Sequence, residues 1–217
     1  MGNLEEAMSR LEEAITGRYT CESANSDQSL GCGETIGLAA LRQGDIVVDL
    51  GCGSGKDAVA AAYVVGEEGH VIGVDMTEAM LEKARARQRE AGLANVSFRL
   101  GTVEDLPVES ETVDVVLSNC VINHVSDKAG AYREISRVLK PGGRFVIADV
   151  ASRYQLPPEV TGDPQAWADC YGGAIPEEEY LAVIAAAGLR EIKVLKRREY
   201  EKNGFPMISL TIEGKKP

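Results

Sequence analysis

The sequence predicts an α/β protein built on one doubly wound, mainly parallel sheet, and three observations lead to that expectation. From residue 46 onward, short apolar runs typical of strands buried on both faces alternate with helical segments. The composition, 44% hydrophobic and 26% charged over 217 residues, is that of a single globular domain with a sizeable core. An Asn203-Gly204 pair separates the last two apolar segments and indicates a hairpin.

The N-terminal segment is expected to form a helix followed by a loop. Leu4, Met8, Leu11 and Ile15 recur at helical spacing, with Glu and Arg on the opposite face. Residues 16–33 are rich in Ser, Asn and Gly, which is typical of a loop.

The first half of the sheet is expected to be wound by alternating strands and helices. We expect strands at residues 46–50, 71–74, 96–100 and 113–117, and helices at residues 58–65 and 77–91. Gly92 suits the left-handed position that follows a helix end. Asp127 can cap a further helix that runs to Leu139, where residues 141–143 (Pro-Gly-Gly) would end it.

The second half of the chain is expected to complete a seven-stranded sheet. The fifth strand is predicted at residues 145–148, followed by an irregular stretch at residues 152–175. Pro176 and three glutamates are typical of a helix start, and Gly188 would end that helix. Strands at residues 190–199 and 207–212 would close the chain as a hairpin, which adds an antiparallel strand at one edge.

The net charge and the cysteine content indicate which binding partners and which cellular compartment to expect for this protein. The formal net charge of −11 disfavours nucleic acid, which needs clustered Lys and Arg. No apolar run approaches the roughly 20 residues that span a bilayer, and the acidic N-terminus is unlike a secretory signal. Five cysteines without a disulfide-framework spacing indicate a reducing cytoplasm. We therefore expect a cytoplasmic protein without nucleic-acid or membrane partners.

A glycine-rich loop after the first strand predicts a nucleoside-binding site. Gly51, Gly53 and Gly55 remove side chains, so the backbone can turn tightly and approach a ligand. In doubly wound sheets, ligands bind beyond the carboxyl ends of the strands where the strand order reverses. Asp75 ends the second strand, 20 residues after Gly55, where a carboxylate can accept hydrogen bonds from ribose hydroxyls.

The details of the loop favour S-adenosylmethionine over a dinucleotide. The dinucleotide fingerprint has the spacing Gly-x-Gly-x-x-Gly, whereas Lys56 stands where its third glycine would be. Asp49 precedes the loop; its carboxylate would repel a pyrophosphate but could lie near the ammonium group of a methionine moiety.

The wider pattern over residues 38–189 resembles the class I methyltransferases. The segments that carry the resemblance are residues 49–55, 74–76, 101–107 and 139–143. The resemblance implies a Rossmann-like fold and S-adenosylmethionine as cofactor. The residues it implies around the cofactor are Asp49, Gly51, Cys52, Gly53, Gly55, Asp75, Met76, Thr102, Val103, Glu104 and Asn119. Met76 would pack against adenine, Val103 and Glu104 would lie near its edge, and Cys52 is interpreted as a tolerated small residue.

We expect one methyltransferase domain over residues 1–217, in three parts. Residues 1–37 would cover the site, residues 38–150 would form the cofactor-binding core, and residues 151–217 would form the substrate side.

Neither histidine is a convincing general base for an oxygen or nitrogen acceptor. His70 is expected in the loop before the second strand, exposed to solvent. His124 follows the fourth strand, near the expected point of methyl delivery. It is either a base or a hydrogen-bonded structural histidine.

Three cysteines suggest a different methyl acceptor. Cys32 lies in a Gly-Cys-Gly segment, Cys120 in a Ser-Asn-Cys-Val-Ile-Asn segment that includes Asn119, and Cys170 in a Cys-Tyr-Gly-Gly-Ala segment. These segments resemble those of arsenite methyltransferases, with His124 in place of a more usual leucine. The resemblance implies that the three thiolates hold trivalent arsenic, with Asn119 beside them and a thiol reductant of the glutathione or thioredoxin type as partner. Thiolates are soft ligands that suit such a centre, whose lone pair could attack the methyl group without a base.

Other interpretations remain open from the residues alone. Each cysteine also fits the role of a small buried hydrophobe, and Cys21 could be a relay or disulfide-forming thiol. The acceptor could be a small organic oxygen, nitrogen or carbon nucleophile, with His124 as its base. The protein could also bind a metalloid without turnover. Zinc is disfavoured because the sequence has no Cys-x-x-Cys pair.

Overall fold

The computed structural model describes residues 10, 13–15, 17–18 and 35–217. The predicted N-terminal helix and loop, with Cys21 and Cys32, therefore lie largely or wholly outside the described residues.

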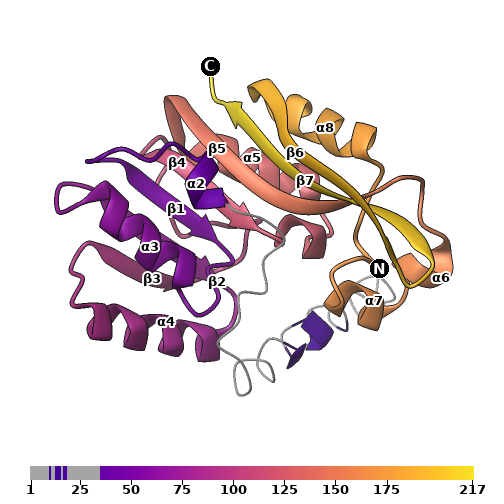
Figure 1. Cartoon of the computed structure of the whole chain (residues 1–217), viewed down its shortest axis with the longest axis horizontal. Coiled ribbons are helices and arrows are strands. Elements are labelled where there is room, and N and C mark those ends of the chain that lie inside the picture. Colours follow the sequence, from indigo (N-terminus) through magenta and orange to yellow (C-terminus); the bar gives the residue numbers. More distant parts are fainter. Residues whose placement is uncertain (1–9, 11–12, 16, 19–34) are drawn as a thin grey trace.

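The sheet has seven strands in the order β3-β2-β1-β4-β5-β7-β6 (Figure 1). Their bounds are β1 Ile46–Leu50, β2 His70–Asp75, β3 Val96–Leu100, β4 Val113–Asn119, β5 Leu139–Ser152, β6 Arg190–Lys202 and β7 Phe205–Lys215. Strands β1 to β5 run parallel, and β7 is antiparallel to both of its neighbours. The order reverses between β1 and β4, so a ligand-binding crevice is expected at the carboxyl ends of these two strands.

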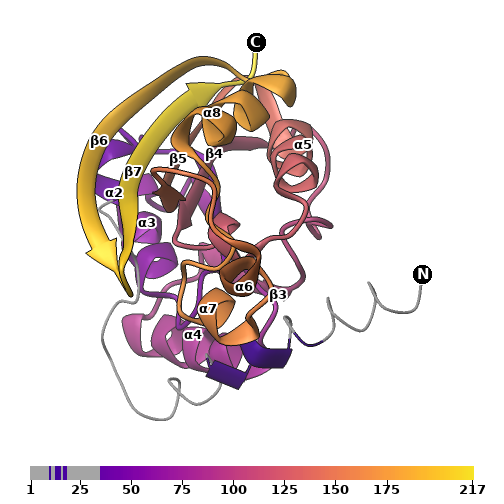
Figure 2. The ribbon, with the colours of Figure 1, turned by 90° about the vertical axis from the view of Figure 1, so that its right-hand side faces the viewer.

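Helices cover both faces of the sheet (Figure 2). They are α2 Thr35–Leu38, α3 Lys56–Val65, α4 Glu78–Ala91, α5 Lys128–Val138, α6 Pro158–Thr161, α7 Pro164–Ala168 and α8 Glu177–Ala186, with a 3₁₀ turn η1 at Ile122–His124. Alternate residues of β1 pack on opposite faces of the sheet. Val47 packs with α3, whereas Val48 and Leu50 pack with the cluster under α5 and α8. The apolar runs of the sequence reflect this burial on both faces.

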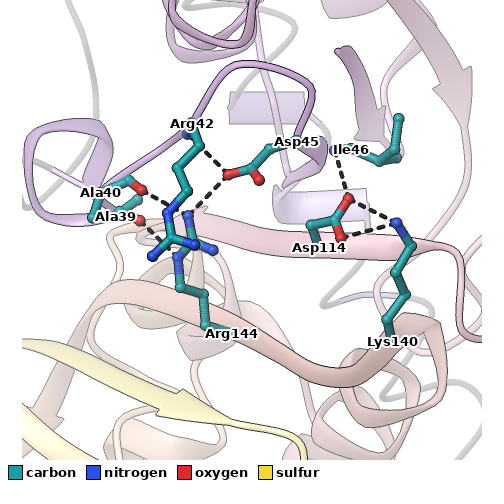
Figure 3. A network of polar contacts seen from close by, with 8 residues as sticks. All are labelled: Ala39, Ala40, Arg42, Asp45, Ile46, Asp114, Lys140 and Arg144. Carbon is teal, nitrogen blue, oxygen red and sulfur yellow. Dashed lines mark hydrogen bonds and ion pairs between the residues drawn. The ribbon is translucent and has the colours of Figure 1, made fainter. Parts of the chain in front are cut away.

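Ion pairs fasten the amino-terminal ends of the central strands, opposite the crevice (Figure 3). Asp114 accepts a hydrogen bond from the amide of Ile46 at 2.9 Å and pairs with Lys140 at 2.8 Å. Arg144 pairs with Asp45 at 2.9 Å. Strands β1, β4 and β5 are thus held together at one end, which leaves their carboxyl ends for the site.

The strands and helices predicted from residue 46 onward are confirmed in type and order, with adjusted bounds. The helix of residues 77–91 begins after Thr77 and ends before Gly92, which adopts the expected left-handed conformation with φ 66°. Asp127 caps α5 by accepting a hydrogen bond from the amide of Gly130. Asn203 and Gly204 have φ values of 53° and 82°, as a tight hairpin turn requires.

The predicted end of α5 and start of the fifth strand were wrong. The helix ends at Val138 and β5 begins at once, so residues 141–143 lie within the strand. The pairing with β4 shifts between Val113 and Val115, and the extra residues bulge out of the ladder. Gly142, at φ 79°, donates its amide to the carbonyl of Lys216 at 2.9 Å.

Three further predictions need correction. Residues 152–175 contain α6 and α7, which each begin with a proline and are too short to show helical periodicity. The antiparallel strand β7 is not at the edge, because it lies between β5 and the edge strand β6. His70 is in β2, where Nε2 lies 2.9 Å from the hydroxyl of Ser97, and burial lowers its pKa.

Candidate functional site

The loop between β1 and α3 has the tight backbone that its glycines predict. Gly51, Gly53 and Gly55 all have positive φ, at 60°, 52° and 77°. A Cβ at Gly51 would lie 2.4 Å from the side chain of Val121, and one at Gly55 would lie 2.8 Å from Ala84. At Gly53 no atom lies within 4 Å of that position, so the backbone there is open to a ligand.

Asp75 ties this loop to the end of β2. Its Oδ2 accepts a hydrogen bond from the amide of Gly53 at 2.8 Å, and its Oδ1 accepts one from Thr77 at 2.9 Å. Burial raises the pKa of Asp75, whereas these hydrogen bonds lower it. A carboxylate oxygen can accept more than one hydrogen bond, so both oxygens can still bind ribose hydroxyls.

Asp49 is a buried carboxylate with an unsatisfied oxygen. It is 3% exposed, and Oδ2 has no hydrogen-bond partner among the described residues. Burial raises its pKa well above the usual value, and the charges of Asp57 and Asp75 raise it further. Three neighbouring carboxylates fit a cationic ligand such as the ammonium and sulfonium groups of S-adenosylmethionine, and would repel a pyrophosphate. Sequence reasoning missed Asp57.

The residues expected around adenine lie at the ends of β2 and β3. Met76 is 38% exposed despite being apolar, as a residue that packs against a flat ligand would be. Thr102 and Glu104 are exposed, whereas Val103 is buried in the core below α5. Val103 could therefore meet a ligand only through its backbone.

Cys52 fills space inside the loop. Its Sγ lies 2.8 Å from the position that a Cβ on Gly73 would occupy, so the thiol packs directly over β2. Burial, and then the charges of Asp49 and Asp75, raise its pKa well above the usual value. The thiol therefore stays protonated, in agreement with a packing role.

Cys120 follows directly on β4, whose last residue is Asn119. It is 3% exposed, has φ 63°, and donates its amide to the carbonyl of Ala148 at 2.7 Å. It is disulfide-bonded in this structure. The amide nitrogen Nδ2 of Asn119 donates to Asp57 at 3.5 Å, which links the end of β4 to the start of α3.

Cys170 is brought to the same place from the loop after α7. It is half-buried, has φ 62°, is not disulfide-bonded, and packs against the apolar cluster that contains Cys120. This cluster lies at the carboxyl ends of β4 and β5, beside α6, α7 and the turn of the β6–β7 hairpin (Figures 1 and 2). Two of the three predicted cysteines therefore belong to one apolar cluster, and the third, Cys32, lies outside the described residues.

The two glycines after Cys170 allow its loop to pack closely against η1 and α7. A Cβ at Gly173 would lie 2.0 Å from the carbonyl oxygen of Asn123 and 2.6 Å from the ring of Trp167. A Cβ at Gly172 would lie 2.6 Å from the backbone of Trp167. Only glycine permits this close approach, which fixes where Cys170 stands.

His124, in η1, contacts the thiol of Cys170. Its Nε2 lies 3.2 Å from Sγ of Cys170, 46 residues along the chain. Burial lowers the pKa of His124 to about 4, and the charges of Arg18, Lys128 and Lys202 contribute. The imidazole is therefore neutral near pH 7. No local signal in the sequence could have revealed this contact.

A buried polar network, also missed by sequence reasoning, holds η1 in place. Lys128 donates to the carbonyls of Val125 at 2.8 Å and Asn123 at 3.4 Å. Burial lowers the pKa of Lys128 to about 8 and raises that of Asp149 to about 6. Tyr180 donates to Asp149 at 2.8 Å. These bonds connect α5, α8 and β5 around the turn that carries His124.

Within the described ranges, no group of three or more His, Cys, Asp or Glu side chains could hold a metal ion. In the same part of the chain, no helix is long and apolar enough to cross a membrane.

Comparisons with known proteins agree with this geometry. The family model described as "Methyltransferase domain" matches residues 41–188. The chain is 39% identical over 202 residues to the arsenite methyltransferase of Halobacterium salinarum, covering 88% of this chain and 52% of the relative. It is 35% identical over 191 residues to that of Mus musculus, covering 84% and 47%. The chain thus spans about half the length of these curated relatives.

A solved structure gives the same result for the fold. The arsenic(III) S-adenosylmethionine methyltransferase of Chlamydomonas reinhardtii superposes with a TM-score of 0.78 at 32% identity, covering 90% of this chain and 72% of that one. The YcgJ protein of Bacillus subtilis, at 24% identity and a TM-score of 0.67, shares the fold. The chain belongs to the class I S-adenosylmethionine-dependent methyltransferase family.

Proposed function

We propose that this protein transfers a methyl group from S-adenosylmethionine to trivalent arsenic held by the thiolates of Cys32, Cys120 and Cys170. The observation that carries the proposal is that Cys120 and Cys170 pack in the same apolar cluster at the carboxyl ends of β4 and β5. The similarity to arsenite methyltransferases, over about half of their length, supports the same substrate.

The residues of the glycine loop would hold the cofactor, which supplies an electrophilic methyl group on a sulfonium. Asp75, fixed by its bonds to Gly53 and Thr77, would bind the ribose hydroxyls. The unsatisfied Oδ2 of Asp49 would accept a hydrogen bond from the ammonium group. Asn119 would keep the start of α3 in register with the end of β4, because it donates to Asp57.

The cysteines would hold the acceptor in a dry pocket. Trivalent arsenic bound by three sulfurs keeps a lone pair, so no base has to remove a proton when the new bond to carbon forms. The apolar side chains around Cys120, which include Leu156, Tyr171 and Met207, would exclude water. His124 lies 3.2 Å from the sulfur of Cys170, beside a proposed arsenic ligand, which favours this acceptor over an organic nucleophile with His124 as base.

The disulfide at Cys120 supports a requirement for a thiol reductant. A sulfur in a disulfide cannot coordinate arsenic, so reduction must precede substrate binding. Glutathione or a thioredoxin-type protein in a reducing cytoplasm would supply it. The N-terminal residues 1–37 would cover the site, because Arg18 donates to the carbonyl of Ala168 and pairs with Asp169 at 3.1 Å.

The test is incubation of the reduced protein with arsenite, a thiol and S-adenosylmethionine, followed by arsenic speciation. We expect methylated arsenic from the natural chain and at least a hundredfold less from Cys120→Ser and Cys170→Ser. Undiminished binding of S-adenosylhomocysteine by both variants is the control for folding. Methylated arsenic at the natural rate from either variant would refute the proposal.

A further inference from the structure

We propose that His124 takes the proton from the thiol of Cys170 as arsenic binds there and passes it to the hydroxide that leaves the arsenic. This inference rests on the proposed function, and its observation is the 3.2 Å contact between Nε2 of His124 and Sγ of Cys170. His124 acts on the sulfur and not on the methyl group, so it is a positioning residue for substrate uptake.

The step neither gains nor loses protons overall. Arsenite in water carries hydroxyl groups on arsenic, and each sulfur–arsenic bond that forms replaces one arsenic–oxygen bond. The thiol proton moves to Nε2 while Sγ binds arsenic, and the leaving hydroxide then takes the proton and departs as water. His124 ends the step unchanged, and neither oxidation nor reduction occurs.

The surroundings of His124 favour a brief transfer over a stable imidazolium. Three cations face it from separate elements: Arg18 near the N-terminus, Lys128 on α5 and Lys202 on β6. Burial and then these cations lower the pKa of His124 to about 4, while a hydrogen bond with the backbone of Trp167 opposes them, so an imidazolium formed here gives up its proton readily.

The remaining charged groups near the contact are already engaged. Asp169, next to Cys170, pairs with Arg18 at 3.1 Å. Lys202 donates to the carbonyl of Asp169 and lies 5.6 Å from the ring of Tyr171. Tyr200 on β6 lies near the sulfur, and burial raises its pKa, so it stays protonated. His124 is thus the neutral proton acceptor in contact with Sγ within the described part of the site.

The experiment compares His124→Gln with His70→Gln in the 217-residue chain, reduced with a phosphine. His70 is the matched control because it lies in β2, bonded to Ser97, away from both thiols. Trp167, the one tryptophan of the chain, lies in α7 three residues before Cys170 and reports arsenite binding by stopped-flow fluorescence. Alkylation of Cys170 by iodoacetamide, followed by peptide mass spectrometry, is a second measurement that needs no arsenic.

We expect His124→Gln to slow arsenite association at pH 7 on the order of a hundredfold, which is typical of proton transfer by a positioned group. The difference should shrink as the pH approaches about 9, where an ordinary thiol ionises unaided. His70→Gln should match the natural chain throughout.

Equal slowing by His124→Gln at all pH values would indicate a merely structural role and would overturn the inference, as would no slowing at all. If the proposed function itself is wrong, the natural chain will neither bind nor methylate arsenite. In that case a pH-dependent loss of Cys170 alkylation in His124→Gln would still support proton transfer between the two side chains, and an unchanged alkylation profile would refute it.

Discussion

Gly173→Ala should disable the site without touching the cofactor loop. The added Cβ would stand 2.0 Å from the carbonyl oxygen of Asn123, and ordinary contact begins near 3.4 Å, so the two backbones must separate by 1.4 Å. Neither side can swing away, because the ring of Trp167 lies 2.6 Å from the same Cβ. The loop that carries Cys170 would move with it and lose the 3.2 Å contact with His124.

The expected cost follows from that displacement. Overpacking of this kind lowers the free energy of unfolding by about 1–3 kcal/mol. A misplacement of about 1 Å at a reacting group can lower a rate on the order of a hundredfold. We therefore expect methyl transfer to arsenic to fall by about that factor, while the affinity for S-adenosylhomocysteine, measured by calorimetry, stays unchanged.

Gly37→Ala is the matched control, because no atom lies within 4 Å of the added Cβ in α2. It should leave the rate and the melting temperature close to those of the natural chain. An undiminished rate of methyl transfer in Gly173→Ala would show that the close approach to Asn123 does not position Cys170.

Three further predictions follow from other parts of the structure. Asp49→Asn should weaken S-adenosylmethionine binding at least tenfold in calorimetry, yet raise the melting temperature of the ligand-free protein; a lower melting temperature would contradict this. The reason is that the pKa of Asp49 is raised in the folded state, so its contribution to stability is full below the unfolded pKa and is lost as the pH rises through the folded pKa. Tyr180→Phe should lower the free energy of unfolding in urea by about 1.5–3 kcal/mol, since it removes a donor to the buried Asp149, whereas Tyr63→Phe on the exposed face of α3 should change it by under about 0.5 kcal/mol. Equal effects of the two tyrosine variants would contradict that assignment. Gly204→Ala should lower the melting temperature through a cost of about 1 kcal/mol, because φ is 82° there, and an unchanged melting temperature would count against a strained turn.

The parts of the fold that the sequence predicts correctly are those with strong local signals. The apolar runs of β1 to β4 report burial on both faces, and Asp127 and Gly92 mark helix ends through their own chemistry. The loop of Gly51, Gly53 and Gly55 is equally local, because positive φ values select for glycine.

The parts that it misses depend on contacts between distant segments. The bulge at residues 141–143 is defined by the shift in pairing next to Val113 and by a hydrogen bond that the amide of Gly142 donates to the carbonyl of Lys216. The order of β6 and β7 depends on which strand completes the ladder of β5. In the site, the contact of His124 with Cys170 joins two segments 46 residues apart. The buried charged side chains of Lys128 and Asp149 are not marked by any periodic pattern in the sequence.

The packing of Val121 on Gly51 has a consequence for any attempt to redesign the acceptor. Val121 follows Cys120 directly, and a Cβ on Gly51 would lie 2.4 Å from its side chain. The glycine loop and the segment that carries Cys120 therefore pack directly against each other through this valine. Under the proposed function, the volume of that side chain would limit how closely the two substrates approach each other. Under the same proposal, replacing the cysteines alone would leave this spacing unchanged, so a larger acceptor would also need a smaller residue at Val121.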